Sequence, residues 1–240
     1  MIVYHLTKVD RQGQFAALQT PLTTTGPCVV TGEFFGDWML ANRPDVAYRF
    51  EELSPLLDQQ LTRRFGPERR SDPAAAITAD TLVALLDVVE HIEHDVEALS
   101  AIAARMEPGA HVVITVPALQ WAFSSWDSEL GHFRRYSRAS LRRAVTAAGL
   151  EVDHVAYLFP ELLPLLPMRK LRRAPRAHAD FPQLSPVVSR VGHAISTLTT
   201  KLRRVWPAGT SVVLTAHAPA TRAATAAATG ASTTERVGHG

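Results

Sequence analysis

The sequence has little cysteine, no long apolar run and little net charge, and each shortage excludes a class of protein. Cys28 is the only cysteine among 240 residues, so no disulfide can form within the chain, and we expect a reducing, cytoplasmic location. No stretch reaches the roughly 18 consecutive apolar residues of a membrane-spanning helix, and the first residues lack the apolar core of a signal peptide. A formal net charge of +2 is too small to indicate a nucleic-acid-binding protein.

Aromatic residues are missing from the last stretch of the sequence, residues 220–240, which is rich in alanine and threonine. Such a stretch buries too little apolar surface to offset the entropy lost on ordering, so we predict a disordered tail. The chain as a whole is 46% hydrophobic and 20% charged, as is typical of globular proteins. We therefore expect residues 1–219 to form one folded domain.

Short apolar runs alternate with amphipathic segments along this domain. The runs are rich in β-branched residues, which is typical of strands buried on both faces of a parallel sheet. Residues 96–103 and 141–148 show helical spacing of apolar residues, the second segment with Ser140 as its predicted cap and Gly149 as its end. The alternation predicts an α/β, Rossmann-like fold with a mostly parallel sheet and helices on both faces. The predicted strands are residues 28–30, 46–50, 81–86, 111–116, 152–157 and 211–215.

Ligands of open parallel sheets bind beyond the carboxyl ends of the strands, so the residues that follow each predicted strand form the candidate site. Gly32 and Gly36 follow the first strand, where glycine lets the backbone approach a ligand, although an ordinary tight turn fits equally well. Glu52 follows the second strand, where a carboxylate can accept hydrogen bonds from a ribose diol. The alternative interpretation of this segment is a helix start with Ser54 as its cap, and both interpretations can hold at once.

A polar and aromatic loop, residues 124–137, follows the fourth predicted strand. It brings groups suited to stacking, proton transfer and anion binding into one short segment. The residues that carry these groups are Trp126, His132, Arg134, Arg135 and Tyr136.

Several motifs, in this order, resemble bacterial class I S-adenosylmethionine-dependent methyltransferases: LDVVEHIE at residues 86–93, EPGA at 107–110 and GHFRRYS at 131–137. The resemblance covers roughly residues 28–219 and is strongest from Asp80 to Leu150. It implies a seven-stranded Rossmann-like sheet, S-adenosyl-L-methionine as cofactor and a small-molecule acceptor. The residues that would surround the cofactor are Gly32, Gly36, Glu52, Asp72 and Asp87.

The first loop departs from the pattern of this family. Val30 stands where the family has an acidic residue, and Phe34 stands where it has the middle one of three glycines. Two interpretations remain open. Either the loop is rebuilt around Phe34 and cofactor binding is kept, or the fold has lost methyl transfer and performs cofactor-independent acid–base or cyclisation chemistry, or serves as a non-catalytic binding subunit.

Histidine supplies the predicted proton transfer. His132 is the first candidate for a general base because imidazole titrates near neutral pH, and His91 is the second. His91 fits equally a role in holding the loop after its strand. We predict no metal site.

The other polar groups of the loop have two interpretations each. Arg134 and Arg135 can clamp a substrate carboxylate or phosphate, or begin a solvated helix. Trp126 and Tyr136 line a substrate pocket or pack beneath it.

A helical insert of about residues 158–208 precedes the last predicted strand. It is apolar, is interrupted by prolines, and carries a basic run, residues 169–173. We favour a lid over the pocket of a hydrophobic or anionic substrate. The alternative is peripheral contact with a membrane surface through residues 158–206.

Overall fold

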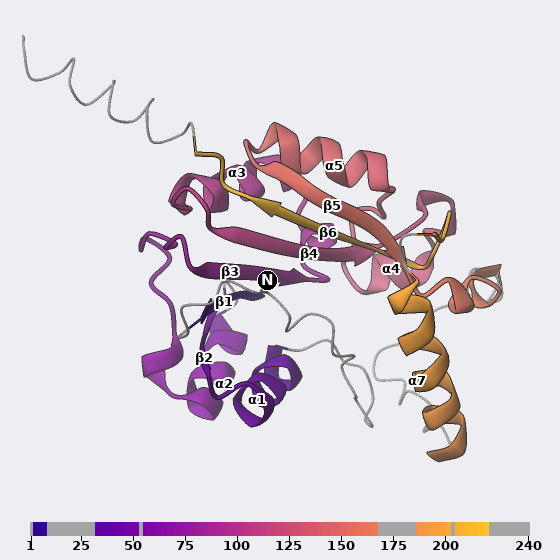
Figure 1. Cartoon of the computed structure of the whole chain (residues 1–240), viewed down its shortest axis with the longest axis horizontal. Coiled ribbons are helices and arrows are strands. Elements are labelled where there is room, and N and C mark those ends of the chain that lie inside the picture. Colours follow the sequence, from indigo (N-terminus) through magenta and orange to yellow (C-terminus); the bar gives the residue numbers. More distant parts are fainter. Residues whose placement is uncertain (1, 9–31, 53–54, 168–185, 203–204, 221–240) are drawn as a thin grey trace, which may run out of the picture.

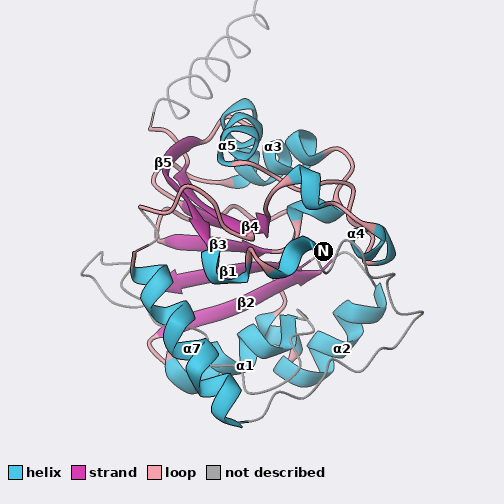
Figure 2. Ribbon diagram, turned by 90° about the vertical axis from the view of Figure 1, so that its right-hand side faces the viewer, coloured by secondary structure: helices cyan, strands magenta, loops and turns pink. Residues whose placement is uncertain are grey.

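The structure is a computed structural model and describes residues 2–8, 32–52, 55–167, 186–202 and 205–220. These residues form a six-stranded sheet between two layers of helices (Figures 1 and 2). The strands are β1 (Ile2–Lys8), β2 (Val46–Glu52), β3 (Thr81–Leu86), β4 (His111–Pro117), β5 (Glu151–Leu158) and β6 (Ser211–His217). The α-helices are α1 (Gly32–Asn42), α2 (Pro55–Phe65), α3 (Asp95–Arg105), α4 (Ser125–Glu129), α5 (Arg138–Ala147) and α7 (Pro186–Lys201). Short 3-10 turns are η2 (Pro67–Arg69), η3 (Val89–His91), η4 (Gln120–Ala122) and η5 (Pro160–Leu162).

The sheet has the strand order β2-β1-β3-β4-β6-β5 and mixed directions. Strand β1 is antiparallel to both β2 and β3, and β6 is antiparallel to both β4 and β5, whereas β3 and β4 are parallel. Strands β2, β3, β4 and β5 therefore share one direction, and their carboxyl ends lie at one edge of the sheet. The prediction of a mostly parallel, seven-stranded sheet is corrected to six strands of mixed direction among the described residues.

The hydrophobic pattern did not predict β1. This strand lies between β2 and β3, with Ile2 opposite Glu52 and Tyr4 opposite Ala84. Backbone groups pair in either direction, so a β-prone segment can enter a sheet antiparallel as readily as parallel. The predicted first strand, residues 28–30, lies outside the described residues.

Successive residues of the central strands pack on opposite faces of the sheet. Val83 and Leu85 belong to the core beneath α3 and α5, whereas Leu82 and Ala84 belong to the core beneath α1 and α2. Burying a side chain of the size of valine or leucine contributes about 1.5–3 kcal/mol. Burial on both faces explains why these strands are continuous apolar runs instead of alternating ones.

The two helices predicted from apolar spacing are present as α3 and α5. Leu99 of α3 and Leu141 and Val145 of α5 are buried. The cap of α5 lies three residues earlier than predicted. Ser137 is the cap, because its hydroxyl accepts a hydrogen bond from the backbone N–H of Ser140.

Helix α1 begins at Gly32, so Gly36 lies inside a helix and not in the predicted strand-to-helix turn. A Cβ atom at Gly36 would lie 2.6 Å from Cζ of Phe65 and 2.7 Å from Oη of Tyr48. Glycine at this position therefore allows α1 to pack closely on α2 and β2.

The helical insert before the last strand is present in its described part as η5 and α7. The hydroxyls of Ser196 and Thr199 donate hydrogen bonds of 2.6 and 2.9 Å to the carboxylate of Glu161 and join the two elements. Among the described residues, no helix is long and apolar enough to cross a membrane. The predicted basic run at residues 169–173 and the tail from residue 221 lie outside the described residues.

Candidate active site at the carboxyl edge of the sheet

Two loops that follow the parallel neighbours β3 and β4 meet at the carboxyl edge of the sheet. Asp87 has φ +51°, and its backbone N–H donates to the carbonyl and hydroxyl oxygens of Thr115 at 3.0 and 3.2 Å. This turn leads into η3, which carries Glu90 and His91. The second loop is fixed to the first because the backbone N–H of Phe133 donates to the carbonyl oxygen of Glu90 at 2.8 Å. The resulting group of side chains, here called the edge cluster, consists of Asp87, Glu90, His91, Asp127 and His132.

Asp127 is a buried carboxylate that orients His132. Its Oδ1 atom lies 3.1 Å from Nδ1 of His132 and 2.8 Å from Nε of Arg135, and its Oδ2 atom accepts from the backbone N–H of Ser124 at 3.0 Å. Burial opposes ionisation, but the hydrogen bonds from His132 and Arg135 outweigh it and hold the pKa of Asp127 well below its usual range. An ionised carboxylate only accepts hydrogen bonds, so Nδ1 of His132 carries a proton and Nε2 is left as the free acceptor in the neutral ring.

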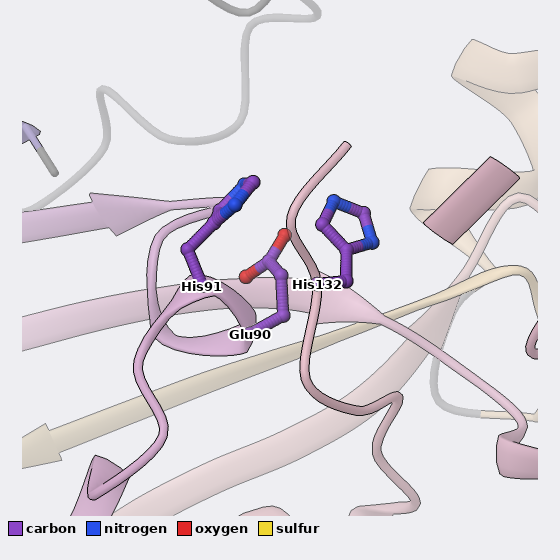
Figure 3. Close-up of side chains that lie close together, drawn as sticks. All are labelled: Glu90, His91 and His132. Carbon is purple, nitrogen blue, oxygen red and sulfur yellow. The ribbon is translucent and has the colours of Figure 1, made fainter. Parts of the chain in front are cut away.

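The two histidines predicted as proton-transfer groups are neighbours in space. The ring centroids of His91 and His132 are 4.6 Å apart, and the rings meet edge to face at 84°. The carboxylate of Glu90 lies between them (Figure 3). Glu90 is fully buried, and neither of its carboxylate oxygens has a hydrogen-bond partner among the described residues.

The edge cluster disfavours charge on several of its members. Burial, followed by the charge of Asp87, raises the pKa of Glu90 to about 9. Burial also raises the pKa of Asp87, against the opposing effects of His132 and of a hydrogen bond with Thr115. Burial, followed by the neighbouring His132, lowers the pKa of His91. Burial therefore favours the neutral forms of Asp87, Glu90 and His91 unless a bound ion supplies compensating charge, whereas Asp127 stays ionised.

Three of the predicted substrate-binding residues make contacts within the chain. Arg135 is buried against Asp127, as described above. Nη1 of Arg134 lies 2.9 Å from Oδ1 of Asp95, and the buried hydroxyl of Tyr136 donates to Oδ2 of the same carboxylate at 2.7 Å. These bonds tie the loop after β4 to the start of α3. Trp126 lies in α4, and its side chain is partly exposed; substrate binding by all four residues stays a prediction.

Two of the predicted cofactor residues lie at the carboxyl edge. Glu52 is the buried last residue of β2, and Asp87 follows β3, with β1 between the two strands. Carboxylates at these positions fit the hydrogen-bond donors of a nucleoside. Gly32 is the first residue of α1, Gly36 packs inside that helix, and Asp72 lies after η2, where its carboxylate accepts a backbone hydrogen bond of 2.9 Å.

Glu90 and Asp127 are members of the edge cluster that sequence reasoning did not single out. Glu90 is part of a Glu-His pair just beyond a buried strand, and Asp127 precedes His132 by five residues in a short polar loop. These positions are the signals that were available. Neither signal reveals that both carboxylates are buried.

The chain was also compared with known protein families and structures. Residues 26–155, more than half of the chain, match a family model described as a methyltransferase domain. The chain therefore belongs to the methyltransferase domain family, in agreement with the resemblance to methyltransferases noted in the sequence. Among curated proteins, none matches the chain.

Solved structures with a similar fold are distant. A SAM-dependent methyltransferase from Archaeoglobus fulgidus is 17% identical with a TM-score of 0.41, over 70% of this chain and 74% of that one. Phosphoethanolamine N-methyltransferase 2 from Haemonchus contortus, solved with S-adenosyl-L-methionine, is 15% identical with a TM-score of 0.40, over 70% of this chain and 42% of that one.

Proposed function

We propose that this protein transfers a methyl group from S-adenosyl-L-methionine to a small-molecule acceptor, with His132 removing the proton of the acceptor. The observation that carries the proposal is the Asp127–His132 pair, at the carboxyl edge of the sheet in a member of the methyltransferase domain family. A buried carboxylate that holds one imidazole nitrogen protonated leaves the other nitrogen free to accept a proton, and it stabilises the imidazolium that forms.

Four residues of the chain have roles in the proposed proton transfer. Nε2 of His132 accepts the proton, and Asp127 stabilises the charge of the resulting imidazolium. Arg135 keeps Asp127 ionised, because its guanidinium donates to the same carboxylate oxygen. His91, whose ring lies against that of His132, is the second candidate for the base.

The cofactor, when bound, supplies an electrophilic methyl group. Glu52 would accept hydrogen bonds from its ribose hydroxyls, and Asp87 would lie beside it at the end of β3. Asp72 and the start of α1 at Gly32 are the remaining predicted contacts. Binding by this set is a proposal, since Val30 and Phe34 depart from the loop of the family.

The test is calorimetric titration of the full chain with S-adenosyl-L-methionine and with S-adenosylhomocysteine. We expect micromolar dissociation constants, and a roughly 10- to 100-fold weaker one for Glu52→Gln, because a charged hydrogen-bond acceptor contributes about 1.5–3 kcal/mol. Glu51→Gln is the matched control, because Glu51 already pairs with Arg105 at 3.0 and 3.1 Å. Absence of binding at millimolar ligand would reject the proposal.

A second candidate is cofactor-independent acid–base or cyclisation chemistry in the same cluster, or non-catalytic binding. It is favoured by the position of Gly36, a predicted cofactor-loop residue whose missing side chain instead allows helix α1 to pack on Phe65 and Tyr48. Its catalytic form requires product formation without added cofactor and no mass gain of one methyl group, whereas non-catalytic binding requires that no product forms. The same calorimetry separates it from methyl transfer.

The acceptor class is proposed from the insert. Apolar side chains of α7 are exposed to solvent, among them Val191, Ile195 and Leu198. We propose that this face covers a hydrophobic or lipid-linked acceptor as a lid. Binding of the face to a membrane surface is the competing outcome, and vesicle co-sedimentation detects it.

A further inference from the structure

The edge cluster contains a buried carboxylate whose oxygens have no hydrogen-bond partner among the described residues. Glu90 is fully buried, and neither carboxylate oxygen receives a hydrogen bond from any described residue. Burying an ionised carboxylate without a partner costs several kcal/mol, so such a group either holds a proton or binds a cation. Arg135, whose charge acts on Glu90, donates its hydrogen bonds to Asp127 and to the carbonyl oxygen of Ala118 instead.

Two imidazoles flank this carboxylate at metal-binding range. Glu90, His91 and His132, here called the triad, each offer one ligand atom, and these atoms lie within 4.8 Å of one another. Nitrogen and oxygen ligands bound to one tetrahedral ion at about 2.0–2.2 Å lie about 3.3–3.6 Å apart. Side-chain rotations that bring the ligand atoms closer by about 1 Å would therefore close the triad on an ion.

His132 is already oriented as metal-binding histidines are. Its Nδ1 atom donates to the buried Asp127, which in turn is held by Arg135. A carboxylate on the remote nitrogen fixes the ring and makes the other nitrogen a better ligand. Figure 3 shows one ring nitrogen of His132 on the side of Glu90 and His91 and the other on the opposite side.

The backbone holds the triad together across the two loops. The hydrogen bond from Phe133 N–H to the carbonyl oxygen of Glu90 joins the segments that carry the ligands. Gly131, with φ +76°, lies beside His91, where a Cβ atom would be in ordinary contact with Nδ1 of that ring at 3.8 Å. His91 is exposed, so an ion held by the triad keeps open positions that face solvent.

We propose that Glu90, His91 and His132 bind one divalent transition-metal ion with open coordination positions. Two imidazoles and one carboxylate favour ions such as zinc, iron(II) and cobalt(II), whereas magnesium and calcium prefer oxygen ligands throughout. This site goes beyond the proposed methyl transfer and does not rest on it. It departs from the prediction, drawn from the sequence, that the protein has no metal site.

A bound ion changes the role of His132. Its Nε2 atom cannot coordinate the ion and accept a proton at the same time. In the metal-bound protein, an acceptor hydroxyl on an open position would lose its proton to solvent, because the ion lowers the pKa of a bound hydroxyl.

The experiment uses the full chain after treatment with a chelator and without cofactor or acceptor. Cobalt(II) is titrated and its visible absorption followed, and zinc(II) is titrated by calorimetry. We expect one equivalent of either ion to bind, and at least about 100-fold weaker binding in Glu90→Gln and in His91→Ala, because loss of an outer partner alone costs 10- to 100-fold. Magnesium and calcium should not compete.

Two variants serve as comparisons. His111→Ala removes a histidine whose ring lies 5.8 Å from that of His217 in another pair, and it should keep the affinity of the wild type. Asp127→Asn should weaken zinc binding by about 10- to 100-fold without removing a ligand.

Each outcome decides the proposal. Saturable binding that His91→Ala abolishes supports it, and no saturable binding by the wild-type chain, or equal binding by Glu90→Gln and wild type, overturns it. If Glu90→Gln fails to fold, two other measurements test the proposal. They are the affinity of His91→Ala for zinc, at an exposed position, and the zinc-induced rise in the unfolding temperature of the wild type. Titration of the metal-free chain with S-adenosyl-L-methionine is scored separately, so failure of the methyl-transfer proposal and failure of the metal site are told apart.

Discussion

Nε of Arg135 donates a 2.8 Å hydrogen bond to Oδ1 of Asp127, and both side chains are buried. Removing one partner of a buried ion pair leaves a charge in the interior without compensation. We therefore expect Arg135→Met to lower the free energy of unfolding by about 3–5 kcal/mol. Chemical denaturation followed by circular dichroism measures this loss.

Arg134→Met is the matched control for that substitution. Arg134 pairs with Asp95 at 2.9 Å, but its side chain is 32% exposed, so we expect a loss of about 1 kcal/mol or less. A substrate clamp would behave differently. If Arg135→Met left stability unchanged and raised KM for an acceptor, the sequence-based substrate role would hold and the structural role would fail.

Tyr136→Phe tests the bond that joins the loop after β4 to α3. The buried hydroxyl donates to Asp95 at 2.7 Å, and removing a hydrogen bond to a charged group costs about 1.5–3 kcal/mol. Hydrogen exchange should become faster in both joined segments. Unchanged stability would mean that another donor replaces the hydroxyl.

Gly36→Ala separates a packing role from a cofactor-loop role. The added Cβ atom would meet Phe65 at 2.6 Å, and overpacking of this kind costs about 1–3 kcal/mol. We expect a lower unfolding temperature with little change in the affinity of the folded protein for S-adenosyl-L-methionine. Phe65→Leu combined with Gly36→Ala should recover part of the loss, which a double-mutant cycle detects. A stable variant that has lost cofactor binding would restore the loop interpretation.

Most of the fold could be predicted from the sequence, because strands buried on both faces appear as continuous apolar runs. Residues 81–86 and 111–116 are continuous apolar runs and are the strands β3 and β4. The direction in which strands pair leaves no such pattern in the sequence, so the antiparallel pairing of β1 with β2 and β3 could not be predicted. Phe35 and Met39 of α1 recur at helical spacing, a signal that the glycines on either side of Phe35 obscured.

For the candidate site, the sequence predicted which residue types take part and which strands and loops carry them. His91 and His132 were identified because imidazole stands out after a strand and in a polar loop, and the structure brings the two rings together. The sequence did not predict which side chains of the loop after β4 are buried, and burial is what separates their roles. Arg135 and Asp127 are buried and bonded to each other, whereas the neighbouring Phe133 is exposed.

His132→Ala tests the proton-transfer proposal. A positioned base contributes about 100- to 10,000-fold to a rate, so we expect kcat for methyl transfer to fall within this range. Affinity for S-adenosyl-L-methionine should stay nearly unchanged, since the cofactor contacts are assigned to other residues. His111→Ala, a half-buried histidine of another pair, is the control and should keep full activity. Unaltered turnover in His132→Ala would remove this residue from the mechanism.

The exposed apolar face of α7 provides the last prediction. Ile195 and Leu198 are 44% and 58% exposed, so replacing both with serine should change the free energy of unfolding by no more than about 0.5 kcal/mol per site.

If α7 closes over a hydrophobic acceptor, the same double variant loses apolar contact only when substrate is bound. Each side chain contributes about 1.5–3 kcal/mol on full burial, so KM should rise by at least tenfold while kcat changes little. Steady-state kinetics with an apolar acceptor measures this split. Ser196→Ala, which breaks a bond to Glu161 but leaves the apolar face intact, controls for general disturbance of the helix. Unchanged KM together with weaker co-sedimentation of the variant with anionic vesicles would instead show that α7 binds a membrane surface. In that case the two side chains would contribute to membrane binding and not to substrate binding.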